Sequence, residues 1–535
     1  MLNKIMLITY PDSMGHNLKD LRHILNRYFK DAVKMVHILP FFPSSGDRGF
    51  APLGYEKVSE EFGDWEDIRM LSEEYPLMFD YMINHISAHS PYYQDFLENK
   101  DQSPYRGLFI RYKDFWKNGM PTQAETDAIY KRKPRAPYVM AEFGNQTQEA
   151  VWCTFGEEQI DLNMETEEGK RFLEENLRWL ARHGASLIRL DAFAYAVKRP
   201  GTSCFFVEPD IWELLERCAK IAAEEGAQIL PEIHEHFSIQ QKLACRDYYV
   251  YDFALPMLLL HAIYFKNSEY LKHWFEICPR KQFTTLDTHD GIGVVDVRGL
   301  LPDEEIEAAK EHLFEYGANV KRVYNTEKYN NLDIYQINCT YYSALGDDDN
   351  AYLLARAIQF FAPGTPQVYY VGLLAGKNDI SLLEETKEGR NINRHYYTEE
   401  EIGREVERPV VKQLLELMKL RNTHPAFDGE FYMLPCEKEQ LILGWKNGDS
   451  RIELDVYFSS EGLCGYGEGW CVYGNPVFRS SNFRNPDLMH FRAGIHYGQL
   501  HGDFPHRTQK DRPGAGGHLP GSISGHCAGI QCFLF

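Results

Sequence analysis

Three acidic residues stand at the ends of short apolar segments of the sequence. Asp191 follows Leu187–Leu190, Glu232 follows Ile229 and Leu230, and Asp290 closes the segment 282–290. Two carboxyl groups held close together acquire unequal proton affinities, so that one can stay ionised while the other holds a proton. This arrangement suits cleavage of a glycosidic bond, in which one group attacks the sugar carbon and the other protonates the leaving oxygen.

The spacing around Asp191 predicts how this carboxylate is positioned. Leu187, Ile188 and Leu190 indicate a short buried strand, and Arg189 leaves the same side of that strand as Asp191, where it can hold the carboxylate ionised. A purely structural Arg–Asp pair is an equally good interpretation of this segment alone. The 41 positions from Asp191 to Glu232 accommodate one right-handed helical crossover, which places both acids on neighbouring parallel strands.

The rest of the chain alternates predicted strands and helices, as is typical of an α/β protein. Eight strand–helix units and the lack of a GxGxxG motif after the first strand favour a closed (β/α)8 TIM barrel over an open dinucleotide-binding sheet. Asp290 then returns over the same rim from the seventh strand, where His85, His234 and His289 also converge. The predicted strands cover 5–9, 33–39, 77–83, 187–191, 228–234, 248–253, 282–290 and 366–371, and the predicted helices cover 18–29, 65–75, 167–183, 211–225 and 352–361.

The alternation of predicted strands and helices is interrupted in two places, which predicts two inserted subdomains. We assign residues 1–84, 165–290 and 350–426 to the barrel, 85–164 to an insertion after the third strand and 291–349 to an insertion after the seventh. A small C-terminal β domain begins at 427–455. Beyond it the composition shifts toward glycine and histidine and β alternation ceases, so our hypothesis is that 456–535 is a reading-frame or assembly artefact, or an unfolded extension.

Composition narrows the classes of partner. The chain has 535 residues and a net charge of −21, which disfavours nucleic acid and anionic membranes as partners. Its 11 cysteines are scattered without a CxxC pair, and the apolar run at the N-terminus is too short for a signal peptide. We therefore expect a cytoplasmic enzyme of small-molecule substrates, with no metal and no cofactor, and leave a homodimer open.

The motifs together resemble the α-amylase superfamily, glycoside hydrolase family 13, and within it the sucrose phosphorylases. The resemblance extends from the N-terminus to about residue 455. The superfamily motifs are Asp80-Tyr-Met-Ile-Asn-His85, Gln159-Ile-Asp-Leu-Asn163, Ile188-Arg-Leu-Asp-Ala192, Pro231-Glu-Ile-His234 and Leu286-Asp-Thr-His-Asp290. The narrower group is indicated by Thr202-Ser-Cys-Phe205, Tyr251-Asp-Phe-Ala-Leu-Pro256, Thr340-Tyr-Tyr-Ser-Ala-Leu345 and Gly389-Arg-Asn-Ile-Asn-Arg-His395.

The resemblance implies a retaining transfer of the α-glucosyl group of sucrose to inorganic phosphate, giving α-glucose 1-phosphate and fructose. It implies that Asp191 is the nucleophile, Glu232 the general acid and base, and Asp290 the stabiliser of the oxocarbenium-like transition state. The residues expected to bind substrate are Asp47, Phe50, His85, Arg189, Tyr195, His234, His289 and Arg390.

An acid-rich chain must supply a cation where phosphate binds, and the basic run Lys131–Arg135 is a candidate. Without the family, such a run is more often a solvated face, with odds of about two to one. The family places an arginine in this loop, and Lys133 is our candidate for its position. Tyr335 and Gln336 belong to the second loop that the family uses there.

Four alternatives remain open. The segment Pro43–Pro52 and the basic run resemble sucrose 6F-phosphate phosphorylases, whereas Tyr335 resembles the sucrose type, so we rank sucrose first by a small margin. An α-glucosidase or transglucosidase would use the same acids. A non-catalytic sugar-binding barrel is disfavoured because all three acids are present. His234 and His236 could form a metal-binding pair, but the fifth strand is an unusual place for it.

Overall fold

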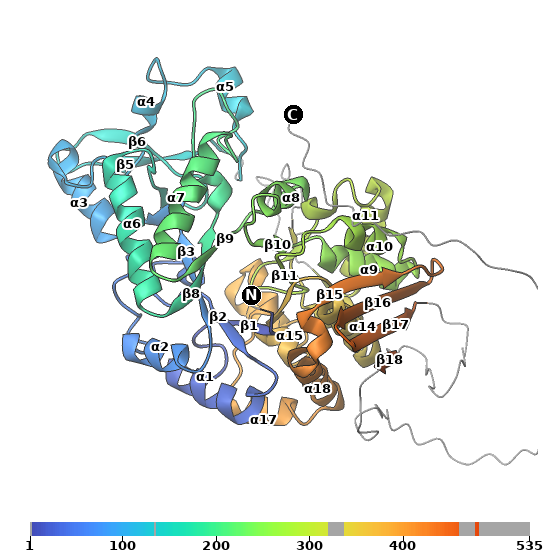
Figure 1. Ribbon diagram of the computed structural model, residues 1–535. Coiled ribbons are helices and arrows are strands. Elements are labelled where there is room, and N and C mark those ends of the chain that lie inside the picture. The colour runs from blue at the N-terminus through green and yellow to red at the C-terminus, as the bar shows by residue number, and fades with distance from the viewer. Residues whose placement is uncertain (1–2, 133–134, 319–335, 459–476, 481–535) are drawn as a thin grey trace, which may run out of the picture. The chain divides into compact units, whose positions relative to one another are not determined.

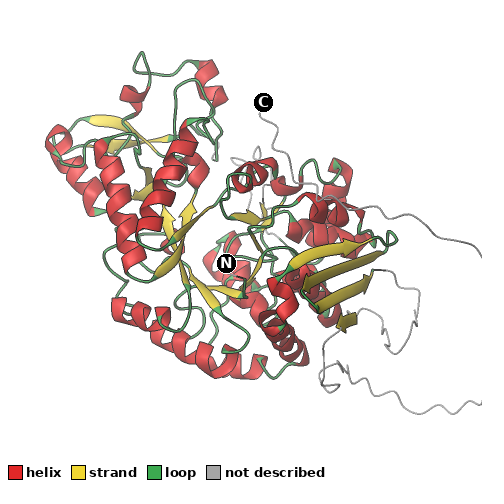
Figure 2. Cartoon of the chain, in the orientation of Figure 1, coloured by secondary structure: helices red, strands yellow, loops and turns green. Residues whose placement is uncertain are grey.

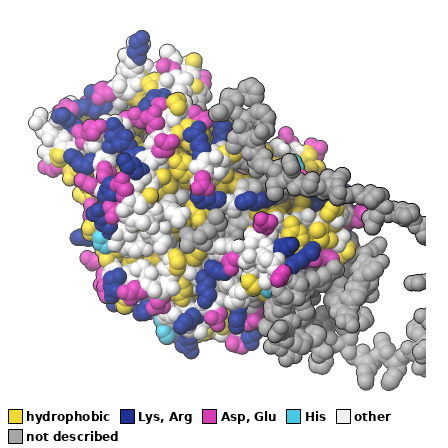
Figure 3. All heavy atoms as spheres, viewed as in Figure 1, with side chains coloured by type: hydrophobic (Ala, Val, Ile, Leu, Met, Phe, Trp, Pro, Cys, Tyr) yellow, Lys and Arg dark blue, Asp and Glu magenta, His cyan; other side chains and the backbone are white. Residues whose placement is uncertain are grey.

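The computed structural model describes residues 3–132, 135–318, 336–458 and 477–480. All of these residues belong to a compact unit that spans residues 1–482. No helix among the described residues has both the length and the apolar character needed to cross a membrane. On the face drawn in Figure 3, acidic and basic side chains are interspersed rather than gathered into patches of one sign.

Eight parallel strands form one sheet in the order β10-β11-β14-β1-β2-β3-β8-β9. Strands β9 and β10, at the two ends of this order, contact each other, so the sheet curls into the predicted barrel with helices around it (Figures 1 and 2). The (β/α)8 prediction is confirmed. The strands are β1 (Met6–Thr9), β2 (Met35–Ile38), β3 (Leu77–Met82), β8 (Ala185–Asp191), β9 (Gln228–Pro231), β10 (Val250–Asp252), β11 (Gln282–Thr284) and β14 (Thr365–Tyr369).

The surrounding helices form where apolar residues recur at helical spacing behind a capping residue. In α6 (Glu167–Arg182), the buried residues Phe172, Leu173, Leu177 and Leu180 form one stripe, and the Thr166 side chain accepts a hydrogen bond from the Gly169 amide at the helix start. The other long helices are α2 (Trp65–Ser72), α7 (Asp210–Glu224), α9 (Leu255–Phe265), α10 (Glu269–Ile277), α14 (Asp349–Phe361) and α18 (Pro409–Thr423). Shorter helices are α8 (Ser238–Ala244), α15 (Tyr370–Leu373), α16 (Ile380–Thr386) and α17 (Glu399–Glu405).

The first predicted helix differs from the structure in its second half. Residues Leu18–Ile24 form α1, but Leu25–Phe29 continue as a π-helical segment. Leu25 and Phe29 stay buried, so the apolar periodicity located the segment correctly without distinguishing the two helix types.

The barrel interior is layered. Alternate residues of a strand face the same side, and Met6, Met35, Met78, Leu187 and Leu230 from five neighbouring strands form one buried apolar cluster with aromatic residues of β10 and β11. Two positions further along β2, β3 and β8, the inward residues are His37, Asp80 and Arg189, all buried. A charged layer therefore lies between the apolar layer and the end of β8 that carries Asp191.

The segment after β3 folds into an ordered subdomain. Its helices are α3 (Pro91–Asn99), α4 (Tyr112–Phe115) and α5 (Gln123–Ala128). Its strands are β4 (His85–Ser87), which pairs with β7 (Gln159–Asp161), and β5 (Tyr138–Glu142), which pairs with β6 (Gln148–Trp152). Tyr112, Trp116 and Trp152 pack together as a separate small core.

The segment after β11 has more regular structure than its sequence predicts. Helix α11 (Asp303–Glu315) and α13 (Tyr341–Ala344) lie in this range, and β12 (Ile292–Gly293) pairs with β13 (Gln336–Ile337). The acidic first turn of α11 and its buried Ile306, Ala309 and Leu313 are helix signals that the sequence analysis did not use.

The C-terminal sheet is antiparallel, with the order β15-β16-β17-β18 (Figure 1). Its strands are β15 (Glu430–Leu434), β16 (Gln440–Asn447), β17 (Ser450–Tyr457) and β18 (Val477–Ser480). Strand β18 pairs with β17, so β structure extends beyond residue 455, where we expected it to cease. Residues 459–476 and 481–535 of the atypical tail lie outside the described residues.

Candidate active site

The three predicted acids line one pocket at the carboxyl ends of the barrel strands. Asp191 is the last residue of β8, Glu232 directly follows β9, and Asp290 lies in the loop beyond β11. The pocket has an empty volume of about 660 Å3, which includes space open to solvent. It is lined by Asp47, Phe50, His85, Arg132, Phe155, Gln159, Asp191, Ala192, Ala194, Tyr195, Phe205, Glu232, Ile233, His234, His289, Asp290, Gln336 and Arg390.

Arg189 holds the first two acids at one guanidinium group. Its Nη1 donates to Asp191 Oδ1 at 2.8 Å, as the two-residue spacing predicts, and its Nη2 lies 3.9 Å from Glu232 Oε1. The same Nη1 also donates to Asp80 Oδ1 at 2.5 Å. One buried cation therefore serves three carboxyl groups.

The ionisation of Asp191 depends on Glu232. Burial raises the pKa of Asp191 to about 8, Arg189 opposes that rise, and the Glu232 carboxylate adds to it. Protonation of Glu232 removes the added repulsion and so favours the ionised form of Asp191. The direct hydrogen bond from Arg189 stabilises the ionised form of Asp191 against the effect of burial.

A turn in the backbone aims Glu232 across the site. Ala192 has a φ of 54°, in the left-handed region, and its amide donates to Glu232 Oε2 at 3.0 Å. The other carboxyl oxygen, Oε1, lies 3.5 Å from His234 Nε2. One oxygen of Glu232 is thus fixed by the backbone while the other faces the pocket side chains.

Asp290 is held in its ionised form. Burial acts to raise its pKa, but His289, Arg390 and Arg189 together lower the pKa well below the ordinary range. Burial also lowers the pKa of His289 to about 3, so this imidazole is neutral near pH 7 and the arginines supply the stabilising charge. Arg390 lies 3.3 Å from Asp290 Oδ1 and 3.5 Å from Asp47 Oδ1, so it joins the two acids.

Phe50 forms an apolar wall of the pocket. Its ring stacks on His289 with the ring centres 4.8 Å apart and an interplanar angle of 4°. Its carbonyl oxygen accepts hydrogen bonds from His85 Nε2 at 3.0 Å and Gln159 Nε2 at 3.1 Å. Burial lowers the pKa of His85, which is therefore a neutral donor in this contact.

His234 stands beside Glu232, and its ring contacts different partners from that of His236. It stacks on Phe253 and contacts Asp296 through Nδ1 at 3.5 Å and Gln336 through Nε2 at 3.1 Å. His236 instead contacts Ser238 Oγ at 2.9 Å. Burial acts to lower the pKa of His234, but Asp296 raises it overall. Among the described residues, no group of three or more His, Cys, Asp or Glu side chains could hold a metal ion.

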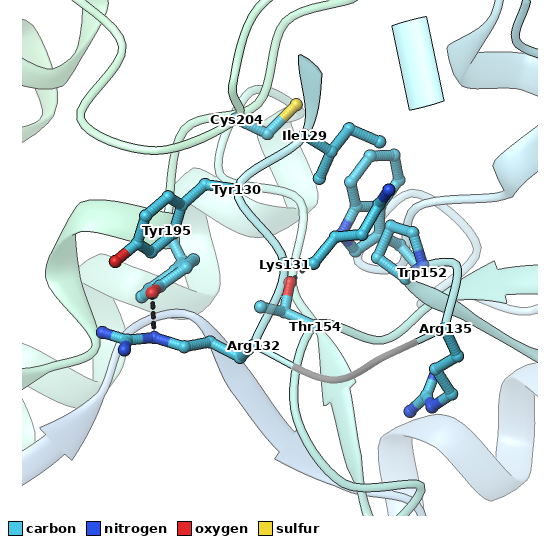
Figure 4. A pocket seen from close by; sticks show the side chains of 10 residues that line it. Ile129, Tyr130, Lys131, Arg132, Arg135, Trp152, Thr154, Tyr195 and Cys204 are labelled. Carbon is cyan, nitrogen blue, oxygen red and sulfur yellow. Dashed lines mark hydrogen bonds between the residues drawn. The ribbon is translucent and has the colours of Figure 1, made fainter. Parts of the chain in front are cut away.

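The basic loop of the first insertion reaches the pocket through Arg132. Its Nε donates to the Tyr195 hydroxyl (Figure 4). Its Nη2 donates to the His234 carbonyl at 3.5 Å. The guanidinium lies 5.4 Å from the ring centres of both Tyr130 and Tyr195. Tyr195 packs in turn against Phe155 and Phe205.

Two predicted residues, Lys133 and Tyr335, lie outside the described residues. All the others predicted to bind substrate line the pocket except Arg189, which lies beneath it and contacts the two acids. Seven lining residues were missed: Arg132, Phe155, Gln159, Ala192, Ala194, Phe205 and Ile233. Arg132 stands next to the chosen lysine in the basic run, and Gln159 opens a quoted motif, but neither pattern shows which side chain points inward.

Comparison with known proteins identifies the family of this chain. The α-amylase catalytic domain family matches residues 8–250. A sucrose phosphorylase from Streptococcus mutans is 60% identical over 427 residues, covering 80% of this chain and 89% of that protein. A sucrose 6(F)-phosphate phosphorylase from Thermoanaerobacterium thermosaccharolyticum is 46% identical over 464 residues, covering 85% and 94% respectively.

A solved structure of a related enzyme has the same fold. The crystal structure of sucrose 6F-phosphate phosphorylase from Thermoanaerobacter thermosaccharolyticum superposes with a TM-score of 0.82 at 44% identity, covering 86% of this chain and 94% of that one. Identity of this level over most of both chains extends well beyond the barrel motifs. The chain belongs to the sucrose phosphorylase group of the α-amylase superfamily.

Proposed function

We propose that this protein is a retaining phosphorylase that transfers the α-glucosyl group of sucrose to inorganic phosphate. The observation that carries the proposal is the pair Asp191 and Glu232, coupled through one guanidinium at the rim of the barrel. Relatives named as sucrose phosphorylases, at up to 60% identity, support phosphate as the acceptor.

In the first step, an ionised oxygen of Asp191 attacks the anomeric carbon of the glucosyl group. The bond from that carbon to the fructosyl oxygen breaks, and Glu232 gives its proton to this oxygen, so fructose leaves as a neutral sugar. The product on the enzyme is a β-glucosyl ester of Asp191. Arg189 favours this step because it keeps Asp191 ionised before the attack.

In the second step, a phosphate oxygen attacks the same carbon from the opposite face. Glu232, now ionised, accepts the proton of the attacking phosphate, and the ester oxygen leaves as the Asp191 carboxylate. Two inversions give net retention, so the product is α-glucose 1-phosphate.

The remaining pocket residues act on the glucosyl ring. The ionised Asp290 accepts hydrogen bonds from sugar hydroxyls and stabilises positive charge at the anomeric carbon. Asp47 and Arg390 bind sugar hydroxyls, while Phe50, His85, Tyr195 and His289 shape the ring subsite. Arg132 and Gln336 belong to the acceptor side, where Arg132 supplies positive charge for phosphate. The sequence predicts the same role for Lys133 and Tyr335, which lie outside the described residues.

A second candidate substrate is sucrose 6F-phosphate. The basic run that brings Arg132 to the pocket and the 46% identity to a sucrose 6(F)-phosphate phosphorylase favour it. The higher identity to a sucrose phosphorylase favours sucrose, which we keep first. We further propose a cytoplasmic location, and leave assembly as a homodimer to be measured.

Product analysis tests the proposal. The purified protein is incubated with sucrose or with sucrose 6F-phosphate, each with and without inorganic phosphate. We expect α-glucose 1-phosphate and fructose from sucrose and phosphate, with little free glucose. Undiminished sucrose cleavage without phosphate would instead identify a glucosidase or transglucosidase. Faster phosphorolysis of the phosphosugar would reverse the order of the two substrates.

A further inference from the structure

A buried chain of charged side chains runs beneath the catalytic acids. It crosses three neighbouring strands, from His37 on β2 to Asp80 on β3 and to Arg189 on β8. His37 Nε2 lies 2.8 Å from Asp80 Oδ2, and Asp80 Oδ1 accepts from Arg189 Nη1 at 2.5 Å. The side chains of His37 and Asp80 are fully buried, and that of Arg189 is 3% exposed.

Arg189 divides one hydrogen-bonding nitrogen between two acids. Its Nη1 donates both to Asp80 and to Asp191, which lies 2.8 Å away. The two carboxylates therefore compete for the same donor, and a stronger hydrogen bond from Arg189 to Asp80 weakens the one to Asp191. Any group that controls the ionisation of Asp80 also controls how strongly Arg189 holds the nucleophile.

His37 is placed to exert this control. A carboxyl group without access to water becomes ionised only when neighbouring donors compensate its burial. Asp80 accepts one contact on each oxygen, from His37 and from Arg189, and together these lower its pKa although burial acts to raise it. On the other side of the ring, Gln367 Nε2 of β14 lies 3.3 Å from His37 Nδ1, which keeps the imidazole turned toward Asp80.

We propose that His37 is a positioning residue for the nucleophile: it holds Asp80 ionised beneath Arg189, and thereby divides the positive charge of this guanidinium between Asp80 and Asp191. The hydrogen bond from Arg189 is then strong enough to keep Asp191 ionised, and weak enough to leave the carboxylate oxygen reactive toward a sugar carbon. The inference rests on the proposed role of Asp191 and adds a residue that never contacts the substrate.

The groups around His37, Asp80 and Arg189 determine the direction in which loss of His37 would change the pKa of Asp191. Asp80 is faced by His37, Arg189 and the neutral His289, and Asp191 by Arg189, Glu232 and Asp80. The buried phenols Tyr55 and Tyr251 adjoin the same acids, and burial raises the pKa of both, so they are uncharged. Loss of the His37 donor would favour protonation of Asp80. A neutral Asp80 would no longer repel the Asp191 carboxylate or compete with it for Arg189, so the pKa of Asp191 would fall.

The test compares pH profiles of kcat/KM with the glucosyl donor that the wild type cleaves. His37→Phe keeps a ring but removes the donor, His37→Gln keeps a donor near Nε2, and Asp80→Asn removes the negative charge directly. Leu187→Val, one layer below on β8, is a packing control without a change in charge. Thermal unfolding establishes that each variant is folded.

We expect the acid limb of the profile to move to lower pH by about one unit in His37→Phe and in Asp80→Asn. The double variant should show no further shift, and His37→Gln and Leu187→Val should keep the wild-type limb. A folded His37→Phe with reduced turnover but an unmoved limb would overturn the proposal, as would additive shifts in the double variant. If His37→Phe does not fold, an unmoved limb in Asp80→Asn overturns it.

This design separates the inference from the proposed function. A wild type that cleaves sucrose without phosphate would refute the phosphorylase assignment, yet its nucleophile would still show the shift in the variants. A wild-type phosphorylase whose variants keep the original limb would refute the role of His37 alone.

Discussion

Replacement of Arg132 by glutamine should convert phosphorolysis partly into hydrolysis. Arg132 is the cation of the first insertion that lines the catalytic pocket among the described residues, and its Nε donates to the Tyr195 hydroxyl. Arg132→Gln keeps a polar side chain that can approach Tyr195 but removes the charge. Water needs no cation to attack the glucosyl ester, whereas phosphate does, so the two acceptors should respond differently.

The expected size follows from the position of Arg132. A hydrogen bond to a charged group contributes about 1.5–3 kcal/mol when it is buried. Arg132 is only partly buried, so solvent screening favours the lower end, about 1.5 kcal/mol. This corresponds to about a tenfold loss in kcat/KM for phosphate. Hydrolysis of sucrose should change little, so the ratio of glucose 1-phosphate to free glucose should fall by about tenfold.

Lys131→Gln is the matched control because it removes the same charge from the neighbouring residue. Figure 4 shows Lys131 extending toward Trp152 and Arg132 toward Tyr195. Both products are quantified over a series of phosphate concentrations for the wild type and the two variants. An unchanged product ratio in Arg132→Gln, or an equal change in Lys131→Gln, would refute the reasoning, because charge near the loop rather than Arg132 itself would then be responsible.

Three further predictions concern the acids and their partners. Asp191→Asn should lower sucrose turnover by at least about 1,000-fold. It should also prevent the glucosyl adduct that we expect intact-mass measurement to detect in the wild type, and a persisting adduct would point to another nucleophile. Arg390→Met removes the cation that Asp47 and Asp290 share. We expect kcat/KM for sucrose, measured by initial rates, to fall by about 10- to 100-fold. A smaller loss would mean that the arginine is dispensable. Burial lowers the pKa of His289 to about 3 in the folded protein, from about 6.5 in the unfolded chain. Between these pH values only the unfolded state binds the extra proton. The free energy of unfolding should therefore fall as pH drops from about 6.5 toward 3. His289→Asn should flatten this decline, by on the order of 5 kcal/mol at most in urea unfolding, and an unchanged slope would contradict the assignment.

The sequence could predict the acids at strand ends because their placement depends on local periodicity. Asp191 and Arg189 share a strand face as a consequence of the two-residue repeat, and Glu232 follows the next buried strand after one crossover. These rules need no knowledge of distant contacts. The barrel and the convergence of the three acids were therefore accessible from the sequence.

The side chains that come from loops were not accessible in the same way. A run of five residues with four cations shows that a basic loop exists, but only the fold determines that Arg132 meets Tyr195. Gln159 reaches Phe50 across 109 positions of sequence, which no local pattern encodes. His37 sits in the apolar strand Met35–Ile38, where the histidine signals a buried partner without identifying Asp80 on the neighbouring strand.

The distribution of charge explains how one site can serve both a neutral sugar and an anionic acceptor. Arg189 is shared by Asp80 and Asp191, and Arg390 by Asp47 and Asp290, so each of these two cations near the glucosyl subsite contacts at least two acids. Excess negative charge there stabilises the positive anomeric carbon of the transition state but repels phosphate.

In the proposed mechanism, formation of the glucosyl ester changes this balance, because it would convert the charged carboxylate of Asp191 into a neutral group. Removal of one charge within the length of a sugar is worth on the order of 1–2 kcal/mol at an effective dielectric constant of about 20 or somewhat higher. Phosphate should therefore enter more readily after fructose has left than before, and Arg132, on the acceptor side, has to offset only the charge that remains. The order of the two half-reactions thus follows from the sharing of cations among the acids.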